Sequence, residues 1–347
     1  MTLALYLSRQ FGGRILAVGL VLLALGLGLD LLDNATDVIR DNGSGAVFEY
    51  AALRVPLITI NLLPIAVLLG ATLAFLALAA RSELVAMRAV GVNTLRILAL
   101  LAPLALALGG GYSLLIDRGA VLAEAGLIEL FPEVAGQPEP GEAIWARTDT
   151  EVIRFHGDRD GGAVLSRVTI FALDAGGTIT SRFDADEARW DGAVWQLVAG
   201  TTGAFGATPE RALAEWRTRL TPEDIRRLAT RPSLVTSGDA RAVLAGVTVG
   251  SRSTFFYESR IQRSWAAWTI PFVMLLFAAL AAFGLIRSGG GARFAAAGIG
   301  LGFTFVVADG FLGTLSEAGL LPPGLAAFAA PGLFAVIALW LIVLMEE

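Results

Sequence analysis

The stretch "ARSELVAMRAVGVNTLRIL", residues 80–98, lies between two long apolar runs and contains four charged side chains. A plain connection would be built from Gly, Ser and Pro. Here good helix formers run from Glu83 to Ala89, Ser82 precedes them as a cap, and Gly91 follows as a stop signal. The stretch therefore predicts a short helix, at about residues 81–91, between two apolar segments.

The composition of the chain is that of a membrane protein. Its 347 residues are 55% hydrophobic and 16% charged, with a mean hydropathy of +0.68. It contains no cysteine, which excludes a disulfide framework, a thiolate metal site and a cysteine nucleophile. All 26 basic residues are arginine, so the chain lacks the lysine that a P-loop places on its phosphates and is not itself a P-loop ATPase.

Six apolar runs are long enough to cross a bilayer, which needs about 20 residues. The first is predicted to be a retained span, because it is longer than the apolar core of a usual signal peptide and no clear small-x-small cleavage site follows it. The predicted spans are residues 15–32, 55–80, 97–116, 265–286, 294–312 and 320–345.

The distribution of arginine predicts the orientation of these spans, because cytoplasmic connections are rich in basic residues. The arginines that flank spans on one side are Arg9, Arg14, Arg81, Arg88, Arg96, Arg287 and Arg293. The loop expected after the first span is acidic instead, with Asp33, Asp37, Asp41 and Glu49. Both termini and the helix around Glu83 are therefore expected in the cytoplasm, and residues 117–263 outside.

The external segment has frequent charges and alternating apolar residues, which are typical of β-strands. Glycine-rich turns separate five predicted strands, and strands this short indicate a small antiparallel sandwich or open barrel. A helix is expected after Thr221, which would cap it, and an amphipathic piece at about 238–249. The strands are expected at residues 143–155, 162–174, 177–190, 192–205 and 211–220.

No catalytic residue or metal site is expected. His156 is the only histidine and is interpreted as a structural or surface residue at a strand end. Asp158 and Asp160 are expected in a turn, where calcium binding is a weak alternative because no EF-hand pattern is present. The "GGG" runs at Gly109 and Gly289 are interpreted as the end of a span and a cytoplasmic turn.

Charged residues at membrane depth are costly and therefore informative. Asp30 lies 16 residues after Arg14, and Asp309 lies 16 residues after Arg293. A helix rises 1.5 Å per residue, so both carboxylates are expected about 24 Å from the cytoplasmic end, near the outer interface. Either water at the interface solvates them, or they line a cavity open to the outside.

The arginines expected at the same level as these carboxylates are Arg54, Arg118, Arg260 and Arg263. They would either anchor the chain at the interface or hold an anionic lipid head group, because guanidinium pairs with phosphate in a bidentate fashion. The candidate head-group residues are Asp30, Asp33, Arg54, Arg118, Arg260, Arg263 and Asp309.

The whole pattern of three spans, an external β domain and three further spans resembles the lipopolysaccharide-export permeases LptF and LptG (the YjgP/YjgQ family). "ARSELVAMRAVGV" is similar to the cytoplasmic coupling segment of that family. "IWARTDTEVIRF" resembles the first strand of its jellyroll, and "GFTFVVADGF" and "GLLPP" resemble the fifth span and the approach to the sixth. The resemblance covers essentially the whole chain, and "RSELVAMRAVG" leans toward the LptG branch.

The resemblance implies a helical membrane protein with six transmembrane helices and a periplasmic antiparallel β-jellyroll inserted between the third and fourth. It implies three parts: residues 1–116 with the coupling helix, 117–250 with the jellyroll and connecting helices, and 251–347. It also implies the permease subunit of an ABC transporter in the bacterial inner membrane, with both termini cytoplasmic. No cofactor is expected on this chain, because ATP and Mg²⁺ would bind the partner ATPase.

The partners implied are a second permease (LptF if this chain is LptG), a dimer of the ATPase LptB, the transmembrane helix and jellyroll of LptC, and LptA. The complex would take lipopolysaccharide from the outer leaflet and pass it to this periplasmic bridge. The helix around Glu83 would insert in a groove of the ATPase, or else be only an amphipathic surface loop. The implied coupling residues are Glu83, Leu84, Met87, Arg88 and Val90.

Two departures from the family pattern concern the head group. The outer end of the first span reads "LDLLDNATD", where the LptG pattern has a basic residue, and Arg118 is the only arginine at the outer end of the third span. A less phosphorylated lipid A, a contribution from the partner permease, or a divalent ion between carboxylate and phosphate would explain this.

Two other classes of protein remain to be compared. A membrane-anchored envelope sensor or assembly factor would bind a partner through its β domain, for example by adding a strand at an open edge, and would not need Glu83. An intramembrane enzyme is disfavoured, because Asn61, Thr72 and Thr304 are too few and too weak as polar residues near the middle of the membrane.

Overall fold

The computed structural model describes residues 3–346 except 133, 135–142, 148–149, 160–161, 175–177, 199–200, 205–210, 213–214, 219, 229–230, 249, 251 and 287–290. The chain divides into two compact units. One unit, here called the helical unit, comprises Met1–Ala135 and Glu258–Glu347. The other, here called the β unit, comprises Gly136–Tyr257.

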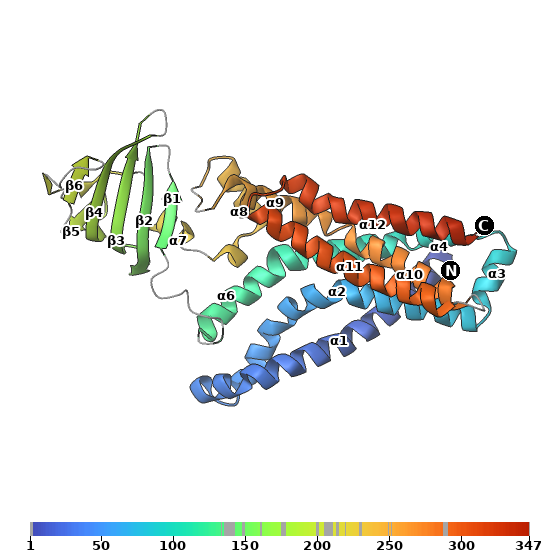
Figure 1. Cartoon of the computed structure of the whole chain (residues 1–347). Coiled ribbons are helices and arrows are strands. Elements are labelled where there is room, and N and C mark those ends of the chain that lie inside the picture. Colours follow the sequence, from blue (N-terminus) through green and yellow to red (C-terminus); the bar gives the residue numbers. More distant parts are fainter. Residues whose placement is uncertain are drawn as a thin grey trace. The chain divides into compact units, whose positions relative to one another are not determined.

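The helical unit begins with a hairpin of two long helices, α1 (Leu3–Asn42) and α2 (Ala46–Ala80) (Figure 1). The sequence predicted an acidic loop after the first span. This prediction is wrong, because α1 continues through that segment to Asn42. No glycine or proline interrupts residues 33–41, and the helix ends only at Asn42 before Gly43, which has the positive φ of 81° that a helix terminus requires.

The helix predicted from the opening stretch is α3 (Glu83–Ala89). Gly91 ends it as expected, with a φ of 81°. The N–H of Val92 donates to the carbonyl of Met87 at 3.0 Å and that of Gly91 to Arg88 at 2.9 Å, which is the Schellman arrangement. The predicted cap is wrong: Ser82 has a left-handed φ of 58° and its side chain makes no capping hydrogen bond.

The third predicted span is a bent series of helices, α4 (Thr94–Leu100), α5 (Ala102–Leu114), a π-helical turn (Leu115–Gly119) and α6 (Ala120–Leu130). The bend after α4 is 49°. Pro103 explains it, because proline lacks the N–H that would bond the carbonyl of Ala99. The helical structure therefore continues past residue 117, where the sequence predicted the external segment to begin.

The C-terminal part of the helical unit contains α9 (Thr254–Ala266) from Glu258 onward, α10 (Ile270–Ile286), α11 (Gly291–Glu317) and α12 (Pro323–Glu346). Helix α10 lies at the centre, where it packs against α2, α5, α11 and α12. Its side chains from Val273 to Ala282 are buried. This agrees with its sequence, because a helix that is apolar on every face has no side suited to contact with water.

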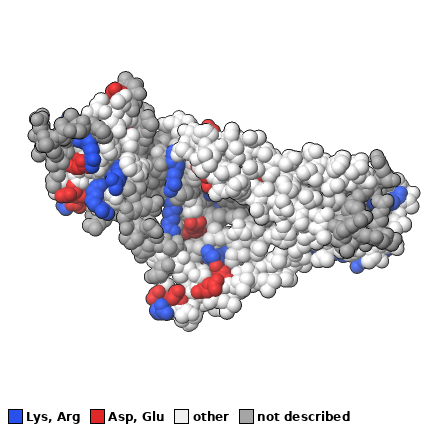
Figure 2. Space-filling view, in the orientation of Figure 1, with Lys and Arg blue, Asp and Glu red and all other residues white. Residues whose placement is uncertain are grey.

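Four helices are long and apolar enough to cross a membrane: α1, α2, α11 and α12. Two bent pairs, α4 with α5–α6 and α9 with α10, meet the same test together, among the residues that the structure describes. On the face seen in Figure 2, charged residues of the helical unit gather toward its two ends and leave an uncharged band between them.

The "GGG" run predicted to end a span lies inside α5 instead. A Cβ atom on Gly109 would lie 2.5 Å from the carbonyl oxygen of Trp268, and one on Gly110 would lie 2.9 Å from the indole ring of Trp268. These two glycines therefore let the bend between α9 and α10 approach α5 closely. Gly111, the third, faces open space.

We predict that Gly109→Ala lowers the melting temperature of the purified protein in detergent. Overpacking costs about 1–3 kcal/mol, which exceeds the gain of about 0.5–1 kcal/mol from removing glycine from a helix. Gly111→Ala is the matched control, because no atom lies within 4 Å of its new methyl group, and it should be neutral or stabilising. Equal melting temperatures for the two variants would contradict this account of the packing.

The β unit contains one antiparallel sheet with strand order β1-β2-β3-β4-β5-β8, and β6 and β7 pair beside β4. The sequence predicted five strands, and the described residues form eight. The first, fourth and fifth predicted strands each correspond to two strands in the structure. The strands are β1 (Ala143–Arg147), β2 (Glu151–Arg159), β3 (Val164–Leu173), β4 (Ile179–Trp190), β5 (Trp195–Val198), β6 (Thr201–Ala204), β7 (Arg211–Ala212) and β8 (Glu215–Trp216).

One face of this sheet is covered by the unit's own apolar side chains. Ile153, Phe155, Trp195 and Trp216 are buried there together with Ile225. The indole N–H of Trp195 donates to the carbonyl of Leu220 at 2.9 Å. The core of the unit is therefore filled by its own residues.

Short helices follow the sheet: α7 (Pro222–Leu228), a 3-10 turn (Pro232–Leu234) and α8 (Ser237–Leu244). The predicted cap of the first is confirmed, because the hydroxyl of Thr221 accepts the N–H of Asp224 at 3.3 Å, and the carboxylate of Asp224 accepts the N–H of Thr221 at 3.0 Å.

The carboxyl group of Glu151, on β2, has a raised pKa because it is partly buried. A hydrogen bond from the indole N–H of Trp216 to this carboxylate acts in the opposite direction and lowers the pKa, but burial has the larger effect.

Two sequence predictions about the loop after β2 need correction. His156 lies inside β2, not at its end, and Asp158 is also part of that strand and not of a turn. Both pair with β3 across the sheet, where the register shifts twice, once between Arg154 and His156 and once between His156 and Asp158. Asp160 and Gly289 lie outside the described residues. Within the described part of the chain, no three His, Cys, Asp or Glu side chains gather as metal ligands would.

Candidate functional site

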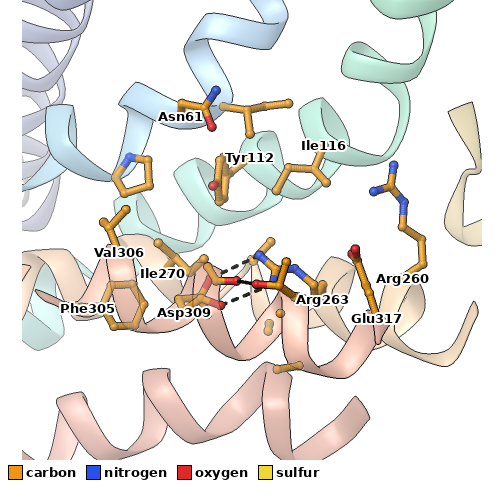
Figure 3. A pocket seen from close by; sticks show the side chains of 18 residues that line it. Asn61, Tyr112, Ile116, Arg260, Arg263, Ile270, Phe305, Val306, Asp309 and Glu317 are labelled. Atoms are coloured by element: carbon orange, nitrogen blue, oxygen red, sulfur yellow. Dashed lines mark hydrogen bonds and ion pairs between the residues drawn. The ribbon is translucent and has the colours of Figure 1, made fainter. Parts of the chain in front are cut away.

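A cavity of about 390 Å³ lies inside the helical unit (Figure 3). Helices α2, α9 and α11 contribute most of its walls, α5 contributes Tyr112, and the π-helical turn contributes Ile116. Such turns are frequent at functional sites because they re-aim side chains locally. The lining residues labelled in Figure 3 are Asn61, Tyr112, Ile116, Arg260, Arg263, Ile270, Phe305, Val306, Asp309 and Glu317.

An ion pair between α9 and α11 crosses this cavity. The guanidinium of Arg263 lies 3.4 Å from the carboxylate of Asp309 and also donates to the backbone carbonyl of Asp309 at 3.4 Å. The side chain of Asp309 is 15% exposed and that of Arg263 is 36% exposed, so the two charges are partly removed from water. Pairing is what makes this burial tolerable, because an isolated charge would be far more costly there.

Gly313 makes room for this ion pair. A Cβ atom on Gly313 would occupy the space of the Arg263 guanidinium, so any larger residue would displace the arginine from α11. Gly313 lies one helical turn after Asp309 and one turn before Glu317. Together with Phe305 they form one stripe along α11 that faces the cavity.

The cavity is polar at one end and apolar at the other. Arg260 and Glu317 lie at the polar end, and Phe305 and Val306 lie at the opposite end, with the Arg263–Asp309 pair between them (Figure 3). Two arginines and two carboxylates balance in formal charge. A ligand that carries both an anionic group and an apolar part would match both ends of such a cavity.

A second cluster joins α1 and α2. The hydroxyl of Tyr50 donates to the carboxylate of Asp30 at 2.9 Å, and Arg54 donates to the same carboxylate through Nε at 2.9 Å and through Nη2. The Arg54 guanidinium also lies 5.9 Å from the ring centre of Tyr50, whose side chain is buried. Asp30 is therefore held by protein partners, and it does not line the cavity that contains Asp309.

The structure thus separates the predicted head-group residues into groups. Arg260, Arg263 and Asp309 line the cavity, and Asp30 and Arg54 form the second cluster. Asp33 and Arg118 are exposed and belong to neither group. Sequence analysis did not identify Tyr50, Tyr112 or Gly313, although the spacing of Asp309, Gly313 and Glu317 by four residues was a usable signal.

The predicted coupling residues also fall into two groups, one buried and one exposed. Leu84 and Met87 are buried and belong to the same apolar core as Leu7 and Phe11, so they do not face outward as contacts to a partner. The side chains of Val85 and Val90 are 66% and 78% exposed instead. The periodicity of a seven-residue helix does not reveal which face is covered, because other elements, such as α2, supply the cover.

The carboxylate of Glu83 has a partner within the chain. The hydroxyl of Tyr6 donates to it at 2.7 Å, and the guanidinium of Arg81 lies 4.0 Å away. Arg88 is exposed on the same helix. Helix α3 and the N- and C-terminal ends of the chain lie at the same end of the helical unit (Figure 1), away from the charged end of the cavity.

Long apolar helices around a partly charged cavity, with a small antiparallel sheet between them in the sequence, are the features of a polytopic membrane protein. The family described as "Lipopolysaccharide export system permease LptF/LptG" matches residues 5–343. The chain therefore belongs to the LptF/LptG family of lipopolysaccharide-export permeases, which are inner-membrane proteins.

Two relatives carry the name "Lipopolysaccharide export system permease protein LptG". One is from Escherichia coli strain K12 and is 25% identical over 361 residues, which cover 97% of each chain. The other, from Escherichia coli O6:H1 strain CFT073, has the same identity and coverage. The resemblance drawn from the sequence is confirmed at the level of the family, and these names agree with the lean toward LptG.

We predict that Arg263 and Asp309 are energetically coupled. Each single change to Ala should destabilise the protein, because it leaves the other charge unpaired, and the double variant should lose less than the sum by roughly 0.5–3 kcal/mol. A double-mutant cycle of unfolding in detergent measures this. The exposed pair Arg40–Asp37, 3.1 Å apart, is the control, with about 0.2–0.5 kcal/mol expected. Equal coupling in both pairs would contradict the prediction.

Proposed function

We propose that this chain is one of the two permease subunits of an ABC transporter. The transporter extracts lipopolysaccharide from the outer leaflet of the inner membrane and passes it to a periplasmic bridge, driven by ATP hydrolysis on an LptB-type ATPase dimer. The observation that carries the proposal is the cavity, charged at one end and apolar at the other, inside a bundle whose opposite end bears α3. ATP and Mg²⁺ are proposed to bind the partner ATPase, because this sequence lacks the lysine of a P-loop.

The proposed topology counts each bent pair of helices as one span, which gives six spans. It assigns both termini and α3 to the cytoplasm and the β unit, as a jellyroll, to the periplasm. The arginines near α3 support this orientation through the positive-inside rule. The division into residues 1–116, 117–250 and 251–347 remains part of the proposal.

The cavity is proposed to receive the head group of the lipid. Arg260 and Arg263 would bind its phosphates, and the apolar end near Phe305 would contact the adjoining acyl chains. A phosphate that replaces Asp309 at Arg263 would free α11 from α9, because this ion pair joins the two helices. The second permease or a divalent ion at a carboxylate would complete the site.

Coupling is proposed to pass through α3 as a rigid link. Glu83, Arg88 and the exposed Val85 and Val90 would contact the ATPase. Leu84 would act from inside, because it is packed into the same apolar core as α1 and transmits a displacement of α3 to the spans. A second permease would cover the exposed apolar faces, and the LptC helix and jellyroll with LptA would follow on the periplasmic side.

The coupling role is tested by co-purifying the chain with an LptB-type ATPase and a second permease, with ATPase activity read in lipid discs. Glu83→Ala should abolish assembly or lower the lipopolysaccharide-stimulated rate at least tenfold, because it removes a charge that the partner binds. Tyr6→Phe is the matched control: it removes the internal hydrogen bond to Glu83 but leaves the carboxylate, so it should assemble normally.

Two results would overturn this role. If Tyr6→Phe reproduces the loss, Glu83 acts through packing within the chain. If neither the wild type nor a variant forms a complex, the transporter proposal fails, and a membrane-anchored envelope sensor or assembly factor that binds through the β unit becomes the better account.

The head-group role predicts a separate effect of Arg260→Gln. The lipopolysaccharide concentration that half-maximally stimulates the ATPase should rise about tenfold, the size expected from losing one charge-assisted hydrogen bond to an anion. Arg40→Gln, an exposed arginine on α1, should leave it unchanged. An equal response of the two variants would remove the cavity from the transport path.

A further inference from the structure

The face of the β sheet opposite its core carries stacked aromatic rings and arginines. The rings of Trp145 and Phe171 are parallel within 8°, with centres 6.3 Å apart. Arg154 lies 5.8 Å from the ring centre of Trp145, and Arg182 lies 5.8 Å from that of Phe171. Trp145 is 49% exposed, which leaves a large flat apolar surface beside two cations.

A hollow of about 300 Å³ adjoins this aromatic platform. Arg154 belongs to both, since it lies over Trp145 and also lines the hollow. Most of its lining residues are polar or charged, and the hydroxyl of Thr169 donates to Asp184 within it at 2.8 Å. Its lining comprises Arg154, His156, Arg167, Val168, Thr169, Asp184, Ala185 and Asp186.

A β-bulge directs Arg167 to this hollow. Arg167 and Val168 together oppose the single residue Phe155 of β2, because Arg154 pairs with Thr169 and His156 with Ser166. Arg167 has a φ of 48°, a left-handed conformation that is costly for a residue other than glycine. Bulges of this kind re-aim a side chain, and here Arg167 joins Arg154 on one face.

Among the residues that the structure describes, neither arginine of the hollow forms an ion pair with a carboxylate. Arg182 forms an ion pair with Asp184 at 2.8 Å. By contrast, Arg154 lies 3.4 Å from the imidazole of His156, and within the described part of the chain Arg167 has no ion pair. The hollow therefore offers two guanidinium groups to an anion, next to the carboxylate oxygens of Asp184 and Asp186.

We propose that this surface binds an anionic saccharide. The rings of Trp145 and Phe171 stack against the apolar face of a sugar ring, Arg154 and Arg167 bind its phosphate or carboxylate group, and Asp184 and Asp186 accept its hydroxyl groups. This site goes beyond the permease function proposed above, because it lies in the β unit and is argued from the chemistry of its own residues.

The carboxylates decide between a saccharide and an acidic peptide. Asp184 and Asp186 disfavour any anionic group near them, but they can accept hydrogen bonds from the hydroxyl groups of a saccharide, which a peptide of acidic residues lacks. The size of the hollow, at the lower end of the range of about 300–1,000 Å³ for small-ligand sites, suits one or two sugar rings. An exposed, stacked indole ring is also a poor surface for a purely ionic ligand.

The test measures binding of dextran sulfate, uncharged dextran and polyglutamate to the full chain in lipid discs on a biosensor. Dextran sulfate should bind at least tenfold more tightly than the other two. Trp145→Ala and Arg167→Asn should each weaken it about tenfold, as expected for losing a stacked ring or a charge-assisted hydrogen bond. Asn tolerates the left-handed conformation of residue 167, so this variant retains the bulge.

Arg189→Gln is the matched control, because Arg189 is an exposed arginine of the same sheet that pairs with Glu187. It should bind as the wild type does, and all variants should melt at the wild-type temperature. The proposal is overturned if polyglutamate binds as tightly as dextran sulfate, which would indicate an acidic peptide or protein. It is also overturned if variants that melt normally bind as well as the wild type.

The saccharide has two sources, the sugar part of the transported glycolipid or a free envelope polysaccharide. Lipopolysaccharide with its saccharide and lipid A without it distinguish them. If Trp145→Ala weakens binding of the first but not the second, the glycolipid is the source. If it weakens dextran sulfate alone, the site takes free polysaccharide. Neither result depends on complex formation with an ATPase, so failure of this proposal and of the permease proposal are separable.

Discussion

Charge inside an apolar helical bundle has to be paired, and this constraint shapes the helical unit. Asp309 binds Arg263 between α11 and α9, and Asp30 binds Arg54 and Tyr50 between α1 and α2. Each pair joins two helices that are distant in sequence or connected by a turn. An unpaired charge there would cost several kcal/mol. The ion pairs therefore hold their helices together, and a ligand that separates two of them has to supply a new partner for the charge.

Glycine makes these approaches geometrically feasible. Gly313 leaves room for the Arg263 guanidinium, and Gly109 lets the backbone of Trp268 contact α5. In both places a methyl group would have to displace backbone or a charged side chain. Helices α9 and α10 meet at a bend of 49°, which lies at Trp268 beside α5, and α10 remains buried at the centre. A charged cavity and a tightly packed core thus coexist in one bundle.

The two ends of the helical unit suit different tasks. One end holds α3, anchored from inside by Leu84 and Met87 and exposed at Val85 and Val90. The other holds the charged end of the cavity. In the β unit, the core face is filled by tryptophan and aliphatic side chains, so its opposite face, with Trp145 and Phe171, is the one that offers a binding surface. Membership of the LptF/LptG family connects these features to lipopolysaccharide export.

The sequence by itself determined the membrane class, the existence of α3 with its stop at Gly91, the inserted antiparallel sheet and the family. The length of the apolar runs, the alternation of apolar residues in the strands and the positions of glycine are local properties of the chain, so the sequence alone reveals them. Tertiary structure alone decided that Asp30 and Asp309 lie in separate clusters, that Leu84 and Met87 face inward, and that Arg167 lies on the outer face of the sheet. Those facts depend on which helix covers which face and on one extra residue in a strand, and neither leaves a periodic signal in the chain.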